Sequence, residues 1–149
     1  MSPVNEPPRR RSFSKEERLC SRRAFEYLFE HGFSFREGVL KCFYTFGVAP
    51  EWLQSPVSIA FAVPKHMFRR AHDRHRIRRR MREAFRLNKE ILLPTVKSRQ
   101  QHLVFLLKYQ VRDESDYLRI EKDLKGVLAR LERLARKEAP AETAGTDSP

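Results

Sequence analysis

The sequence predicts an α+β fold: one four-stranded mixed sheet with three helices packed on it. Two observations carry this prediction. Apolar residues recur at helical spacing in three segments, and four other segments alternate between apolar and polar residues or are apolar throughout. Their order along the chain is α-β-β-β-α-β-α, which is typical of helices packed on one α+β sheet.

The first half of the chain supplies one helix and three strands. We expect the helix to begin after an N-cap at Ser21 and to end at Gly32. Alternating residues then predict two strands separated by Gly38. A third strand ends at Pro64, because proline cannot donate to a central ladder. The predicted ranges are helix 22–31 and strands 33–37, 39–47 and 57–63.

The second half supplies two longer helices and one strand. An apolar stripe from Ile77 to Phe85 marks the first helix, and Pro94 closes it. Five consecutive apolar residues in the next strand favour a central position that is covered on both faces. The last helix begins at Ser115 or Asp116. The predicted ranges are helices 70–92 and 116–136 and strand 102–109.

The two ends of the chain differ in composition from its middle. The beginning combines prolines with three consecutive arginines, and the end is rich in Ala, Glu, Thr, Gly, Ser and Pro. Such segments bury too little apolar surface to fold. The predicted division is a disordered basic arm over 1–13, one folded domain over 14–137 and a disordered tail over 138–149.

The chain is strongly basic, with 31 lysines and arginines against 19 acidic residues and a formal net charge of +12. A surplus of this size self-repels unless a polyanion neutralises it. Nucleic acid is the first candidate and an anionic membrane surface the second. No apolar run approaches the roughly 20 residues of a membrane span, and the N-terminus lacks a signal-peptide pattern. Cys20 and Cys42 sit in no CxxC motif. We therefore expect a cytoplasmic protein with two free thiols and no membrane partner.

Arginines are concentrated in the second predicted helix, where they fill eight of the fourteen positions from 69 to 82. Arg74, Arg78 and Arg82 form a row one turn apart, flanked by His75 and Arg79. Guanidinium groups grip phosphate with two donors and stack on bases. The row rises by about 5.4 Å per turn, close to the spacing of successive phosphates. This pattern predicts a helix that binds structured RNA.

Two other interpretations of this helix remain open. It could be a solvated face with intrahelical salt bridges, but few acidic residues are present to form them. It could read DNA, but its apolar face is committed to a core, and no dimer zipper or helix-turn-helix pair is evident.

No self-contained active site is evident in the sequence. The five histidines include no HExxH motif and no metal-ligand spacing, and no glycine-rich phosphate loop or GxSxG motif is present. We therefore expect no small-molecule cofactor.

Four segments resemble the protein subunit of bacterial ribonuclease P. The basic helix resembles the family signature, an Arg-Asn-Arg followed by basic residues and Arg-Glu. Three other segments resemble the family's first helix, the strand before the signature and the last helix. In this sequence the four read RHRIRRRMRE at 74–83, AFEYLFEHG at 24–32, SIAFAVPK at 58–65 and SDYLRIEKDLKGVL at 115–128.

The resemblance implies a fold and an activity. The fold is the predicted one with an unusual left-handed βαβ crossover. The family's protein binds a large catalytic RNA and the 5′ leader of precursor tRNA, and the holoenzyme is an endoribonuclease that removes this leader. The RNA subunit carries the chemistry and binds most of the Mg²⁺. The alternative is a ribosomal or RNA-chaperone protein of similar fold that binds RNA without any reaction.

The resemblance also assigns residues. Those expected to contact the catalytic RNA are Arg70, Arg74, His75, Arg76, Arg78, Arg79 and Arg82. Those expected to line the leader cleft between the first helix and the sheet are Phe25, Phe29, Phe43 or Tyr44, and Lys65. Aromatic rings there would stack on bases without selecting sequence. From the residues alone, core packing explains Phe25 and Phe29 equally well.

The chain departs from the family pattern at His75, where the family has Asn. An amide donates and accepts at once, whereas neutral histidine divides these roles between its two ring nitrogens. Contacts assigned to that Asn therefore do not carry over directly. The segment from Lys65 to Arg74 is also about one residue longer than in the family.

Overall fold

The structure is a computed structural model that describes residues 15–138. The predicted arm lies outside the described residues, as does the predicted tail apart from Glu138. The elements in chain order are η2 (Lys15–Glu17), α1 (Arg22–His31), β1 (Phe33–Glu37), β2 (Leu40–Phe46), η3 (Pro50–Trp52), β3 (Val57–Ala62), α2 (Ala71–Asn88), η4 (Lys89–Ile91), α3 (Leu93–Ser98), β4 (Leu103–Tyr109) and α4 (Tyr117–Lys137), where η denotes a 3-10 turn.

The predicted α+β fold is confirmed. The four strands form one sheet in the order β1-β2-β4-β3. The pairs β1–β2 and β2–β4 are antiparallel and β3–β4 is parallel, so the sheet is mixed. Strand β4 is central and buried along almost its whole length, as its apolar run predicts.

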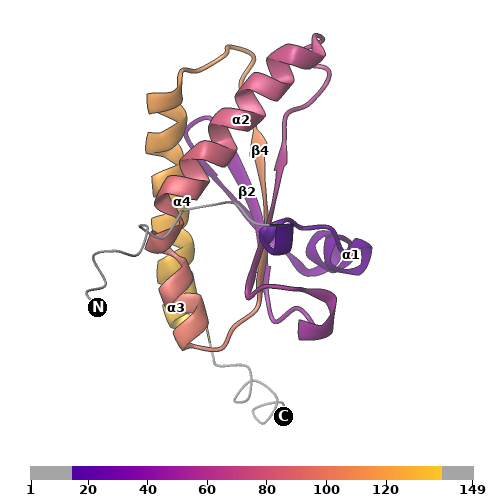
Figure 1. Cartoon of the computed structure of the whole chain (residues 1–149), viewed down its shortest axis with the longest axis vertical. Coiled ribbons are helices and arrows are strands. Elements are labelled where there is room, and N and C mark those ends of the chain that lie inside the picture. Colours follow the sequence, from indigo (N-terminus) through magenta and orange to yellow (C-terminus); the bar gives the residue numbers. More distant parts are fainter. Residues whose placement is uncertain (1–14, 139–149) are drawn as a thin grey trace, which may run out of the picture.

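Helices cover the two faces of the sheet unequally. Figure 1 shows α2, α3 and α4 on one face and α1 alone on the other. The first face holds the larger core, built around Phe85, Phe105 and Leu128. The second face holds a smaller cluster in which Ala24 and Leu28 of α1 pack with Val104 and Leu106 of β4. One face is therefore closed, while α1 leaves part of the other accessible.

The ends of α1 follow from its caps. The hydroxyl of Ser21 accepts a hydrogen bond from the Ala24 N–H at 3.2 Å, and the Gly32 N–H donates to the Leu28 carbonyl at 2.8 Å. Helix α4 likewise begins after Asp116, whose carboxylate accepts from the Arg119 N–H at 3.0 Å.

The predicted single helix over 70–92 is wrong. Helix α2 ends at Asn88, whose side-chain amide donates to the Ala84 carbonyl at 2.8 Å and so competes with the helical backbone bond. A 3-10 turn and helix α3 follow. Pro94 does not close the segment but lies in the first turn of α3, where a missing N–H costs nothing.

The parallel strands β3 and β4 are joined through α2, η4 and α3, so the predicted βαβ crossover is present. Its left-handed sense stays a prediction of the resemblance. Among the described residues, no helix is both long and apolar enough to cross a bilayer.

Candidate nucleic-acid interface

The arginines of α2 fall into two groups, and the first is bound within the protein. Arg76 donates to both carboxylate oxygens of Glu114, at 2.5 and 2.9 Å, and Arg80 donates to Glu114 and to the Ser115 carbonyl, both at 2.8 Å. The hydrogen bonds that Arg76 donates to Glu114 raise the pKa of Arg76, and the bonds that Glu114 accepts from Arg76 and Arg80 lower the pKa of Glu114. These two arginines therefore fasten α2 to the loop before α4.

Arg74 is also bound internally, although the sequence places it in one row with Arg78 and Arg82. Its guanidinium donates to the Phe68 carbonyl at 2.7 Å and to the Arg69 carbonyl at 3.0 Å. It thereby fixes the turn that leads into α2, whose N-cap residue, Arg70, makes no side-chain capping bond. Arg70 itself is exposed.

The second group consists of Arg78, Arg79 and Arg82, with His75 beside them. None of these arginines forms an ion pair within residues 15–138, and the Nε of Arg78 is buried without a hydrogen-bond partner. Burial lowers the pKa of Arg82, and repulsion from Arg18, Arg78 and Arg79 lowers it further. A concentration of cations without carboxylates is the arrangement that a phosphate would stabilise.

All of these side chains except Arg79 line a groove along the outer edge of β3. Arg78, Arg82 and His75 form one wall of a hollow of about 450 Å³, and Ile59, Ala60 and Phe61 form its floor. The opposite wall is residues 18–20. We call this hollow the arginine groove. A second hollow, of about 390 Å³, adjoins both groups of arginines on α2 and is lined by His72, His75, Arg76, Arg79 and Arg82.

The wall at 18–20 is held in place from both sides. The Leu19 N–H donates to the Ile59 carbonyl at 2.9 Å, which extends the sheet by one bridge. Next to it, the Lys89 ammonium contacts both oxygens of Glu17 at 3.0 Å, and these side chains are only 14% and 9% exposed. A buried pair of this kind is costly to break, so the groove keeps its shape.

Aromatic side chains gather beside α1 on the open face of the sheet. Phe25 and Phe29, one helical turn apart, have nearly parallel rings with centroids 6.2 Å apart, and the Phe29 ring meets Phe43 of β2 edge-on at 6.4 Å. Phe25 is half-buried, whereas Phe29 is 62% exposed. Core packing therefore explains Phe25 in part but does not explain Phe29.

A row of cations crosses the same face next to these rings. In the strand register, Arg36 of β1 pairs with Lys41 of β2, and Lys41 pairs with Lys108 of β4. Lys41 also lies 5.1 Å from the centre of the Phe43 ring. Like charges directly opposite one another destabilise a sheet. We call the rings of Phe25, Phe29 and Phe43 together with this cation row the aromatic cleft.

Sequence reasoning missed Arg18, Lys41 and Lys108. The signal for Lys108 was available, because it is the one charged residue in the otherwise apolar strand β4. The signal for the other two was not, since only the strand register places Lys41 opposite Lys108, and only the fold places Arg18 opposite α2.

Of the two candidates on β2, Phe43 lies in the aromatic cleft and Tyr44 does not. Successive residues of a strand point to opposite faces, and Tyr44 packs beside Phe35 on the face that α2 and α4 cover. Gly38, with φ of 58°, lies in the turn between β1 and β2 and leaves the register of β2 undisturbed. Lys65 is exposed in the turn that follows β3.

The described residues show no candidate metal centre, since no three His, Cys, Asp or Glu side chains come together in ligand geometry. Both cysteines are free, as predicted: Cys20 is exposed in the wall of the groove, while burial raises the pKa of Cys42 well above its usual value.

Known proteins provide an independent comparison. A family model described as Ribonuclease P matches residues 13–132. The ribonuclease P protein components of two strains of Porphyromonas gingivalis are each 31% identical over 118 residues, covering 79% of this chain and 85% of theirs.

Among solved structures, the RNase P protein of Thermotoga maritima aligns with a TM-score of 0.59 at 19% identity, over 76% of this chain and 96% of that one. The RNase P protein of Staphylococcus aureus gives 0.59 at 20% identity, over 76% and 94%. These structures share the fold.

Proposed function

This chain belongs to the ribonuclease P protein family, and on that premise we propose that it binds a catalytic RNA and the 5′ leader of precursor tRNA. Family membership makes it a ribonucleoprotein component with a role in tRNA 5′ processing. In the proposed reaction, the holoenzyme hydrolyses one phosphodiester bond and leaves a 5′ phosphate on the mature tRNA. We further propose that it acts in the cytoplasm.

We assign the docking of the catalytic RNA to the arginine groove, and the observation that carries the proposal is the set of unpaired arginines there. Arg78 and Arg82 line the groove, Arg79 lines the adjoining hollow with Arg82, and none of the three forms an ion pair within residues 15–138. Each phosphate bound by such a group releases counterions, and that release favours binding. His75 lines both hollows, at the position where the family has Asn.

We assign the 5′ leader to the aromatic cleft. An exposed ring such as Phe29 offers a stacking surface to any base, while Lys41 and Lys108 meet the backbone phosphates. This combination suits a leader whose sequence differs from one precursor to the next. Lys65, at the end of β3, extends the cation row.

Catalysis itself we assign to the RNA subunit, together with most of the Mg²⁺. Side chains of this protein would raise the local concentration of the substrate and hold its 5′ leader in a fixed position relative to the RNA subunit. The internally bound Arg74 and Arg76 would act indirectly in this proposal, because their guanidinium groups fix the ends of the surface on which the RNA rests.

Reconstitution tests the proposal. The protein is mixed with bacterial ribonuclease P RNA and precursor tRNA at low Mg²⁺, and cleavage of the leader is followed. Restored cleavage is the expected result. RNA binding without cleavage would favour a ribosomal or RNA-chaperone protein instead, and absence of RNA binding would overturn both functions.

Cysteine alkylation provides a second test with an internal control. RNA in the arginine groove should protect the exposed Cys20 from iodoacetamide, whereas the buried Cys42 should stay unreactive with or without RNA. Equal labelling of Cys20 in both states would place the RNA elsewhere.

A further inference from the structure

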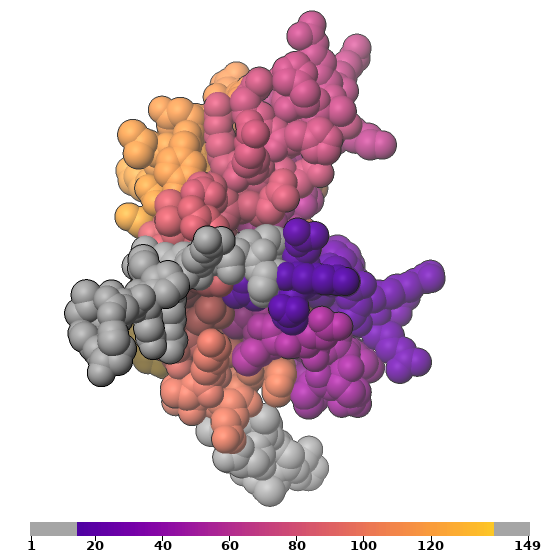
Figure 2. All heavy atoms as spheres, viewed as in Figure 1, coloured from indigo at the N-terminus to yellow at the C-terminus, as the bar shows by residue number. Residues whose placement is uncertain are grey.

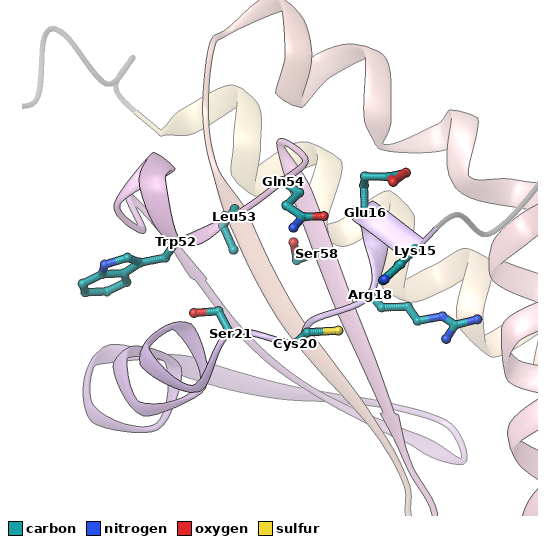
Figure 3. A pocket seen from close by; sticks show the side chains of 9 residues that line it. All are labelled: Lys15, Glu16, Arg18, Cys20, Ser21, Trp52, Leu53, Gln54 and Ser58. Carbon is teal, nitrogen blue, oxygen red and sulfur yellow. The ribbon is translucent and has the colours of Figure 1, made fainter.

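A third hollow lies on the other side of residues 15–21 from α2. It has a volume of about 240 Å³ and lies between this segment and the loop that joins β2 to β3. Figure 2 shows the segment, in indigo, between the surface of α2 and that loop. The hollow is lined by Lys15, Glu16, Arg18, Cys20, Ser21, Trp52, Leu53, Gln54 and Ser58 (Figure 3).

Its walls differ in chemistry. Leu53 provides an apolar side, and half-buried Trp52 lies at the rim, where its ring extends outward (Figure 3) and meets Tyr27 at 6.2 Å. Gln54 provides an exposed amide that makes no hydrogen bond within residues 15–138. In Figure 3 the Lys15 ammonium points toward the hollow, whereas the Glu16 carboxylate points away from it. An apolar surface, an amide and one cation are what a nucleobase with its phosphate requires.

The hollow shares a wall with the arginine groove, formed by residues 18–20. Arg18 and Cys20 line both, and in Figure 3 the Arg18 guanidinium extends away from the hollow, toward α2. Arg18 also repels Arg82 across the groove. A strand whose phosphates lie between Arg18 and Arg82 therefore has a neighbouring space within reach of its next residue.

We propose that this hollow binds one unpaired nucleotide of the RNA that docks in the arginine groove. The base lies against Leu53 with Trp52 at the rim beside it, its polar edge meets the Gln54 amide, and Lys15 holds its phosphate. A base inside a duplex cannot enter, because its faces are stacked and its edge is paired. The inference rests on the proposed function and adds a site that selects an extruded nucleotide.

Trp52 makes the proposal directly measurable, because it is the only tryptophan in the chain. The full-length protein is titrated with ribonuclease P RNA from its own organism, while tryptophan emission and acrylamide quenching are recorded. A nucleotide that enters beside the indole is expected to change the emission and to reduce the quenching constant at least about two-fold. Saturated RNA binding with unchanged emission and quenching would overturn the proposal and leave the proposed function intact.

Two variants distinguish entry of a base from simple coverage of the hollow. Gln54→Ala and Lys15→Ala remove exposed side chains, so both should fold normally. Each is expected to weaken RNA binding by about three- to ten-fold, the range of one lost hydrogen bond or phosphate contact. Lys97→Ala removes the same charge as Lys15→Ala from the exposed surface of α3 and should have little effect. Shielding of Trp52 without any loss of affinity in the two variants would overturn the proposal.

If the parent protein does not bind RNA, the proposed function itself fails. The titration of the parent protein detects that outcome separately from any effect of the variants.

Discussion

The two sides of α2 carry similar numbers of arginines and use them differently. On the side that faces α4, Arg76 and Arg80 are bound to Glu114, a carboxylate 38 and 34 residues away in sequence. On the other side, Arg78, Arg79 and Arg82 form no ion pair within residues 15–138, and Arg18, Arg78 and Arg79 repel Arg82. Arginine density alone therefore does not distinguish the two sides, whereas the placement of the few carboxylates does, and the proposed RNA surface is the side without them.

The largest expected effect comes from removing the groove arginines. The combined change Arg78→Ala, Arg79→Ala and Arg82→Ala should weaken RNA binding by about 10²–10³-fold and lower the log–log salt slope by about 2–3, if each arginine binds one phosphate. Dissociation constants measured over a series of KCl concentrations provide both values.

The control for this variant is Arg80→Ala on the opposite side. It should leave the salt slope nearly unchanged while lowering the free energy of unfolding by about 1 kcal/mol, since it breaks an internal ion pair and a backbone hydrogen bond. Equal slopes in the two variants would abolish the distinction between the two sides.

The next effect concerns the aromatic cleft. Phe29→Ala removes an exposed ring, so the free energy of unfolding should change by less than about 0.5 kcal/mol. Affinity for precursor tRNA should fall about ten-fold in the holoenzyme, the loss expected for one stacked base, while affinity for mature tRNA stays constant. Tyr44→Ala, on the closed face, is the opposite case: it should destabilise the fold without changing the ratio of the two affinities.

A smaller effect is expected at the cation row. Lys108→Gln relieves the repulsion with Lys41 and should stabilise the protein by a few tenths of a kcal/mol, while leader binding weakens about two- to five-fold. Chemical denaturation and binding of precursors with different leader lengths measure the two quantities. Loss of stability together with leader binding would mean that Lys108 is a structural residue.

The smallest effect is a change in acid sensitivity. Arg76 and Arg80 hold the pKa of Glu114 below its unfolded value, and Arg86 does the same for Glu83. The unfolded chain therefore binds more protons in acid. The stability that these pairs contribute is present above about pH 4.5 and is lost as the pH falls through the folded pKa values. Glu114→Gln should flatten the decline in unfolding free energy below about pH 5 and leave its slope near pH 7 unchanged.

Local signals predicted much of the fold. The bounds of α1 and β1 match the expected ranges because Ser21 and Gly32 mark the helix ends through contacts within the helix. Helix α3 was missed because a proline is equally compatible with the end of one helix and the first turn of the next. The apolar stripe of α2 was visible because it repeats within a single element.

The site was only partly predictable, since its decisive contacts span long sequence separations. Helical spacing put Arg74 in one row with Arg78 and Arg82, but the carbonyls of Phe68 and Arg69 draw its guanidinium away. The same spacing could not show that Arg76 meets Glu114. The choice between Phe43 and Tyr44 required the strand register, because a shift of one residue moves a side chain to the other face.

The strand order has a consequence for the timing of assembly. Strand β4 is made last, yet it lies between β2 and β3. Among the described residues, β3 pairs only with β4, apart from one bridge at Arg18. It therefore cannot join the sheet until β4 has formed. When α2 has just been synthesised, β3 is not yet paired, so the floor of the arginine groove is not yet in place. The arginine groove and the aromatic cleft are therefore complete only when the last strand inserts.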